Sequence, residues 1–244
     1  MNNNTTIKQA SMCILLVTIA GTEVIAQQDA VLPAIARDRE APWVNYFPFG
    51  SNDDAPSLTW YQQIYGESEL TDLVGTYISS VAFRVDGSQQ SVRGGIYTLP
   101  DLVIRMSTTD KQVDGLSEIM GDNLGDDLVT VYDGEYTLPE LRGLDSPNPF
   151  DYLIEFQEPF FYSGGNLILD VPVVLVFEPD LAVPLDAAWT NRDSVSRVYE
   201  RNGRVTRDTF GLVTKFTGVA PAPSTVVAMA LGAGVIGARR RRSN

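Results

Sequence analysis

The chain has 244 residues, a length that suits one globular domain with short terminal segments. Its 44% hydrophobic and 20% charged residues are ordinary for a folded protein, which excludes a disordered chain and a polytopic membrane protein. The formal net charge is -13, and it becomes -17 when the four arginines near the C-terminus are not counted. Such an acidic surface repels phosphate backbones, so nucleic acid is excluded as a partner.

From residue 27 onward, the chain lacks the residue types needed for several kinds of catalysis. The sequence contains no histidine, and its one cysteine, Cys13, lies in an apolar stretch near the start. A domain that contains neither histidine nor cysteine has no structural disulfide, no Cys/His zinc site, no cysteine nucleophile and no serine–histidine pair. Carboxylates, Lys, Tyr, Ser or a bound metal remain for catalysis. We nevertheless expect a protein that is not an enzyme.

Residues 1–26 have the pattern of a secretory signal peptide. One cation, Lys8, precedes an apolar stretch, and small residues lead to a cleavage site between Ala26 and Gln27. The pattern predicts a signal helix and export. Because the stretch has a single cation and is interrupted by Glu23, the alternative is an N-terminal helix of the folded domain.

The C-terminal segment 219–244 combines three features in a fixed order. They are a proline motif (Pro221, Ala222 and Pro223), a short apolar helix over 225–238 and a basic run (Arg239, Arg240, Arg241 and Arg242). The apolar run is shorter than the ~20 residues that usually span a bilayer. The arginines are expected to stop translocation and to hold the far end on the cytoplasmic side.

This tail resembles the PEP-CTERM sorting signal of Gram-negative bacteria, whose members are processed by an exosortase at the proline motif. Here the motif reads Pro-Ala-Pro in place of Pro-Glu-Pro, which leaves the subtype of the processing enzyme open. The resemblance implies two partners, an exosortase-like enzyme and, transiently, the inner membrane. It also implies a final place at the cell surface or in the extracellular matrix.

The middle of the chain has the texture of an antiparallel β-sheet protein. Short runs rich in Val, Ile, Leu, Tyr and Phe are separated by clusters of Gly, Asp, Asn and Pro. We expect an all-β fold, an antiparallel and jelly-roll-like β-sandwich over 46–218, preceded by a linker over 27–45. The expected strands are 57–64, 75–84, 102–107, 128–132, 151–157, 166–171, 174–177, 196–200 and 211–216.

Local patterns add detail to this prediction. Strict alternation over 78–85 places Val81 and Phe83 on an apolar face and Ile78 on the opposite face. The dipeptides Asp133-Gly134 and Asn202-Gly203 are expected as turns between strands, and the second is the clearest hairpin.

Several blocks in the middle resemble a recurrent ectodomain that occurs with these tails. The resemblance spans about residues 45–218, ends in a Gly-Leu-Val-Thr-x-Phe strand at 211–216, and assigns no activity or functional residue. The blocks begin at Tyr61 (YQQIY), Val81 (VAFR), Ile104 (IRMSTT), Gly115 (GLS), Asn123 (NLGDD), Phe150 (FD) and Gly165 (GNLILDV).

Two kinds of ligand are suggested by individual residues. The turn with Asp122, Asp126 and Asp127 offers hard oxygen ligands around a glycine, which suits calcium, although a solvated acidic loop is the alternative. β-Sandwich sugar binders stack sugars on exposed aromatic rings, and the aromatic residues here include Trp43, Trp60, Tyr61, Tyr65 and Trp189. Of these, Trp60 and Trp189 are the candidate platforms for a sugar ring. Because Trp60 precedes Tyr61 in an expected strand, the two point to opposite faces, and at least one of them belongs to the core.

Taken together, these patterns predict an exported cell-envelope or extracellular-matrix protein of structural or interaction type, sorted through its tail. The alternative is a carbohydrate-binding module for extracellular polysaccharide. A third hypothesis, a carboxylate-based glycoside hydrolase, needs two carboxylates across a sugar, and Glu155, Glu158 and Asp170 lie in or beside expected strands. An exposed aromatic strip favours binding, a deep acidic pocket favours hydrolysis, and a featureless surface favours a structural role.

Overall fold

The computed structural model describes residues 27–50, 58–87, 97–139, 145–172, 183–189 and 194–221. Within these ranges the chain forms strands and a few short 3-10 helices, and all strand pairs are antiparallel, which confirms the all-β prediction. The strands are β1 (Gln27–Leu32), β2 (Trp43–Asn45), β3 (Leu58–Tyr65), β4 (Thr76–Phe83), β5 (Tyr97–Thr109), β6 (Val129–Leu138), β7 (Tyr152–Tyr162), β8 (Asn166–Pro172), β9 (Leu185–Trp189), β10 (Val195–Arg201), β11 (Arg204–Asp208), β12 (Phe210–Leu212) and β13 (Thr214–Val219). The 3-10 helices are η1 (Ala34–Ala36), η2 (Glu67–Glu69), η3 (Thr71–Leu73) and η4 (Met120–Asn123).

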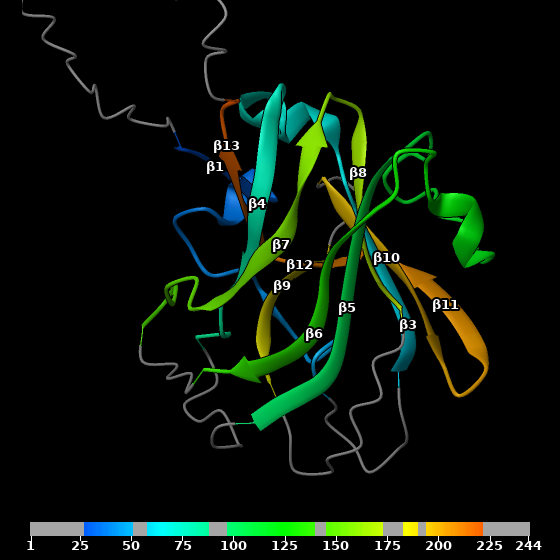
Figure 1. Cartoon of the computed structure of the whole chain (residues 1–244). Coiled ribbons are helices and arrows are strands. Elements are labelled where there is room, and N and C mark those ends of the chain that lie inside the picture. Colours follow the sequence, from blue (N-terminus) through cyan, green and yellow to red (C-terminus); the bar gives the residue numbers. More distant parts are fainter. Residues whose placement is uncertain are drawn as a thin grey trace, which may run out of the picture.

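The strands are arranged in three sheets (Figure 1). A four-stranded sheet has the order β1-β13-β4-β7, a six-stranded sheet the order β11-β10-β3-β8-β5-β6, and a small sheet the order β12-β9-β2. The main hydrophobic core contains residues from all three, for example Phe83, Tyr61 and Leu212. Burial of these side chains is the main driving force for bringing the sheets together.

The six-stranded sheet is apolar on both faces. Tyr61 belongs to the main core, whereas Ile64 lies in a second cluster with Met120 of η4. The segment 110–125 therefore covers the outer face of this sheet. Asn123 fixes the segment in place, because its Nδ2 donates to Gln62 Oε1 of β3 at 2.9 Å.

The expected linker over 27–45 was wrong. Residues 27–32 form β1, which pairs with β13 in the register Gln27↔Val219 to Leu32↔Thr214, and residues 43–45 form β2, which pairs with β9. Both partners lie more than a hundred residues away in the sequence. The polar start of β1 and the shortness of β2 give no local strand pattern, so only the distant partners define them.

Two local expectations also need correction. In β4 the register with β13 shifts so that Ser79 is an extra residue between Ile78 and Ser80. Ile78 therefore joins Val81 in the main core, although strict alternation placed them on opposite faces. Asp133-Gly134 is not a turn: Gly134 lies inside β6, opposite Leu102, with a φ of 154°. β6 is therefore longer than the expected strand over 128–132.

The hairpin at Asn202-Gly203 is confirmed. Both residues have positive φ, 52° and 71°, and Arg201 pairs with Arg204 across the two-residue turn. These angles are those of a type I′ turn, which matches the twist of the flanking strands. The turn joins β10 to β11 at the edge of the six-stranded sheet.

A buried amide joins the six-stranded sheet to the small sheet. Gln63 Nε2 donates to Leu212 O at 2.9 Å, and Leu212 N donates to Gln63 Oε1 at 2.8 Å. Tyr61 Oη also donates to Gln63 Oε1, at 2.6 Å. The side chain thus completes backbone hydrogen bonds that β12 would otherwise lack.

We expect replacement of this amide to destabilise the fold. Gln63→Leu leaves the N–H and C=O of Leu212 and the hydroxyl of Tyr61 unpaired in the interior, which should lower the free energy of unfolding by about 2–4 kcal/mol. Urea denaturation measures this change. Gln28→Leu, at an exposed position of β1, is the control and should change stability little; an equal loss in both variants would contradict the role of Gln63.

Some sequence predictions lie outside the described residues. These are the signal peptide 1–26, the strand 174–177, the apolar helix 225–238 and the four arginines that follow it. In the part of the chain that is described, no helix is long and apolar enough to span a bilayer.

Candidate functional site

Three aromatic rings gather on the small sheet, and we call them the aromatic surface: Trp43 of β2, Trp189 of β9 and Phe210 of β12. The Trp189 and Phe210 rings are stacked with centroids 5.0 Å apart, and the Trp43 ring meets that of Trp189 edge-on at 4.8 Å. The two tryptophans are 44% and 48% exposed. Such a contiguous exposed patch on a small sheet is typical of a binding surface.

A partly buried ion pair positions Phe210. Arg197 of β10 donates from Nε to Asp208 Oδ1 at 2.8 Å and from Nη2 to Asp208 Oδ2 at 3.0 Å. Asp208 Oδ1 also accepts from Phe210 N at 3.0 Å. The Arg197 guanidinium lies 4.8 Å from the centre of the Phe210 ring, a cation–π distance, so the ring is fixed through both its backbone and its face.

A hollow of about 270 Å³ lies beside Trp189. One wall is Trp189 with its neighbour Ala188, and the other wall is the segment after η1, including Arg39 and Glu40. The hollow therefore combines an aromatic ring with one cationic and one anionic side chain. Because Trp189 belongs to both, the hollow and the aromatic surface form one continuous site.

Arg84 holds the loop that forms the second wall. Its Nη2 donates to Ala36 O at 2.8 Å and to Arg39 O at 2.6 Å, and its Nε donates to Asp186 Oδ2 at 2.7 Å. Asp186, on β9, accepts in turn from Ala41 N at 3.0 Å. The Arg84 and Asp186 side chains are 1% and 0% exposed. The pair thus connects β9, which carries Trp189, to the loop opposite it.

Three carboxylates meet near this pair. Oxygens of Glu40, Asp86 and Asp186 lie within 4.8 Å of one another, a spacing that suits a hard divalent cation. The Arg84 guanidinium already supplies positive charge to Asp186, and Glu40 accepts from Gly87 N at 2.5 Å. These contacts give Asp186 and Glu40 partners within the protein itself.

Burial raises the pKa of Asp186 to about 6, and the charge of Glu40 adds to this rise, although the hydrogen bond and charge of Arg84 act against it. The folded-state pKa thus lies above the ordinary value of 3.8. Between these two pH values the folded protein retains a proton that the unfolded chain releases. The contribution of Asp186 to stability must therefore fall as the pH rises from about 4 to about 6.

We expect this titration to be visible against an uncharged control. The free energy of unfolding of the wild type minus that of Asp186→Asn should decrease by on the order of 2–3 kcal/mol between pH 4 and pH 6.5, because asparagine does not titrate. Urea unfolding at half-unit pH steps measures the difference. A difference that stays constant, or grows with pH, would contradict the raised pKa.

The structure separates the two tryptophans that the sequence singled out. Trp189 lies on the aromatic surface, whereas Trp60 of β3 is partly buried and packs on the second hydrophobic cluster. The Trp60 Nε1 donates to Asp170 Oδ1 at 2.6 Å. The expectation that either Trp60 or Tyr61 belongs to the core is confirmed, because Tyr61 is fully buried.

The carboxylates considered for hydrolysis are not gathered around a cleft. Asp170 is buried and accepts from Trp60, from Gln62 Nε2 at 2.8 Å and from Arg105 Nε at 2.6 Å. Glu155 and Glu158 are exposed on β7, in the four-stranded sheet. Asp170 therefore serves as a hydrogen-bonding centre of the six-stranded sheet.

The three aspartates of the expected calcium turn are exposed. Asp127 binds the end of β5, because its Oδ1 accepts from Thr108 N and its Oδ2 from Thr108 Oγ1, both at 2.9 Å. Asp122 lies in η4 and Asp126 between η4 and β6. Calcium binding at this turn stays a prediction.

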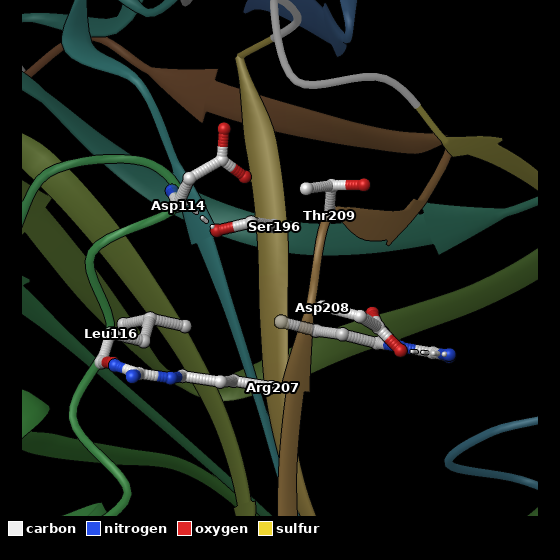
Figure 2. Close-up of a pocket in the computed structure, with 7 residues that line it drawn as sticks. Asp114, Leu116, Ser196, Arg207, Asp208 and Thr209 are labelled. Atoms are coloured by element: carbon white, nitrogen blue, oxygen red, sulfur yellow. Dashed lines mark hydrogen bonds and ion pairs between the residues drawn. The ribbon is translucent and has the colours of Figure 1, made fainter.

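A second hollow, of about 320 Å³, lies where the 110–118 segment meets β10 and β11 (Figure 2). Asp114 N donates to Ser196 Oγ at 2.8 Å, and Arg207 Nη1 donates to Leu116 O at 3.1 Å. The guanidinium of Arg207 points toward Leu116 (Figure 2). The polar groups here join the covering segment to the sheet.

Of the residues expected at the two processing sites, Gln27 and Pro221 are described. Gln27 is the first residue of β1, and Pro221 is exposed two residues after the end of β13. Ala26, Ala222 and Pro223 lie outside the described residues.

Phe210 was not among the aromatic residues singled out in the sequence. Trp43 was among them but was not chosen as a candidate platform. Trp43 stands in the segment expected to be a linker, and Phe210 precedes the expected strand 211–216, so neither position indicates a neighbour of Trp189.

Comparisons of the chain with models of known protein families, with curated proteins and with solved structures find no match. The site must therefore be interpreted from its own geometry.

Proposed function

We propose that this chain is an exported cell-envelope or extracellular-matrix protein whose β-domain binds extracellular polysaccharide through the aromatic surface. The observation that carries the proposal is the contiguous cluster of Trp43, Trp189 and Phe210, with two half-exposed indole rings. Aromatic faces stack on the apolar faces of sugar rings, and indole N–H groups donate to hydroxyls. We also propose that the sheets pack as a jelly-roll-like sandwich, which presents this cluster on a rigid framework.

The fold supports a role in which the domain is attached at one end and binds at the other. Gln27 pairs with Val219, so the start of β1 lies beside the end of β13 (Figure 1). Phe210 precedes β13, whose six residues extend about 20 Å. The proposed signal peptide and sorting tail thus share one end of the domain, away from the aromatic surface.

We propose a binding role in place of a catalytic one. Asp170 is engaged by three donors, which is the environment of a structural carboxylate. Glu155 and Glu158 are exposed on β7, in another sheet than Asp170. Glycoside hydrolysis requires one carboxyl group held as an acid opposite a second one, and this arrangement gives no support for it.

The sorting proposal predicts the two ends of the mature protein. Intact-mass and peptide mass spectrometry of the protein from its native cell envelope or medium should give an N-terminus at Gln27 and a C-terminus within or next to Pro221–Pro223. Both ends are read from one sample. A protein that retains residues 1–26 and the four terminal arginines would contradict export and sorting.

The binding proposal predicts a loss of affinity when the aromatic surface is truncated. Trp189→Ala and Trp43→Ala should each weaken retention by an immobilised extracellular polysaccharide about tenfold or more, because each removes a large stacking area. Affinity electrophoresis measures the change, and thermal unfolding checks that the variants are folded.

Phe161→Ala provides a matched control. Phe161 and Tyr77 form another exposed aromatic pair, 47% and 43% exposed with ring centroids 5.1 Å apart, but they lie on the four-stranded sheet. This variant should bind as the wild type does. Equal losses in Phe161→Ala and Trp189→Ala, or no binding by the wild type, would refute the proposed site.

A further inference from the structure

We infer that the hollow beside Trp189 holds one ring of an uncharged sugar, so that the protein selects neutral over acidic polysaccharides. The inference rests on the proposed function and adds the class of ligand. It draws on the size of the hollow, the chemistry of its two walls and the charge of the domain.

The size of the hollow suits a single ring. Its volume of about 270 Å³ lies just below the ~300–1,000 Å³ of typical small-molecule sites. A whole oligosaccharide does not fit, but one terminal or branching sugar unit does. Further sugar residues of the polymer would continue from Trp189 toward Trp43, whose ring centroid is 4.8 Å away.

The walls of the hollow match the two sides of a sugar ring. Trp189 and Pro42 supply apolar surface, while Arg39 and Glu40 supply donors and acceptors. Arg39 Nε donates a hydrogen bond to Ile35 O at 2.6 Å, which orients the guanidinium on the exposed loop. A vicinal diol offers both donors and acceptors, so it can pair with a cation and a carboxylate at once.

The charge of the domain favours neutral over acidic polysaccharides. The charges of the wall residues Arg39 and Glu40 cancel, as do those of their neighbours Arg37 and Asp38, and the carboxylates of Asp86 and Asp186 lie close to Glu40, so the hollow has no surplus of positive charge. The domain around it is strongly acidic, with a formal charge of -17 without the terminal arginines. A uronic-acid polymer would be repelled by this field and would find no surplus cation in the hollow.

The hollow is also preorganised. Arg84 donates to the carbonyl groups of Ala36 and Arg39, and Asp186 accepts from Ala41 N. The loop wall is thus fixed from the interior by groups that do not line the surface. Binding then costs little conformational entropy in the loop. A ligand that makes few contacts, such as a single sugar ring, can therefore still bind.

The test is affinity electrophoresis of the full-length protein in detergent. The gels contain a neutral polymer (dextran, a mixed-linkage β-glucan or galactomannan) or the acidic polymer alginate. The salt concentration is about 0.15 M, at which charge–charge interactions are only partly screened. We expect retardation by at least one neutral polymer and none by alginate. Arg39→Ala should weaken the retardation about fivefold to tenfold, since hydrogen bonds to a charged group are lost.

Arg37→Ala is the matched control, because it removes the same charge from the same loop at an exposed position that does not line the hollow. It should bind as the wild type does. Stronger retardation by alginate than by every neutral polymer, or equal binding by Arg39→Ala and the wild type, overturns the inference while leaving a polysaccharide-binding function in place. Absence of retardation by any polymer overturns the proposed function itself.

Discussion

The buried contact between Arg84 and Asp186 is the interaction on which the site depends. Neither side chain reaches solvent, yet the pair joins the strand that carries Trp189 to the loop that faces it. Removing one partner from such a pair leaves a buried charge without compensation, which is strongly destabilising. The sequence therefore keeps an arginine at the end of an apolar strand, where a hydrophobic residue would pack well but would leave the carbonyl groups of the loop unpaired.

Much of the fold could be predicted because the strands of the middle carry their pattern locally. Alternating apolar residues and the Asn202-Gly203 turn define strands and a hairpin without knowledge of their partners. The edge strand β1 is different, because its first residues are polar and its pairing with β13 closes a loop of nearly the whole domain. Local patterns give no information about such a pairing. The bulge in β4 was missed for a related reason, since an inserted residue changes which face a side chain occupies without changing its type.

The site was predictable only in part. Trp189 could be chosen from composition, since a tryptophan in a polar neighbourhood is a common ligand platform, and the same reasoning chose Trp60, which instead donates a hydrogen bond to the buried Asp170. Sequence does not distinguish these two roles, because the difference lies in what the opposite strand supplies. Trp43 and Phe210 reach Trp189 through the pairings of β2 and β12 with β9. These pairings are long-range, and so the cluster exists only in the folded chain.

One strand, β13, separates the aromatic surface from the end of the domain where the first and last strands pair. β13 begins just after β12, which carries Phe210, and ends at Val219, opposite Gln27. Gln27 and Val219 therefore lie together, one strand length from the point where β13 follows β12. A protein held at its termini would therefore direct the rings away from the point of attachment, and the net negative charge of the chain would repel anionic neighbours. The pairing of the first strand with the last thus determines the orientation of the site as well as the closure of the fold.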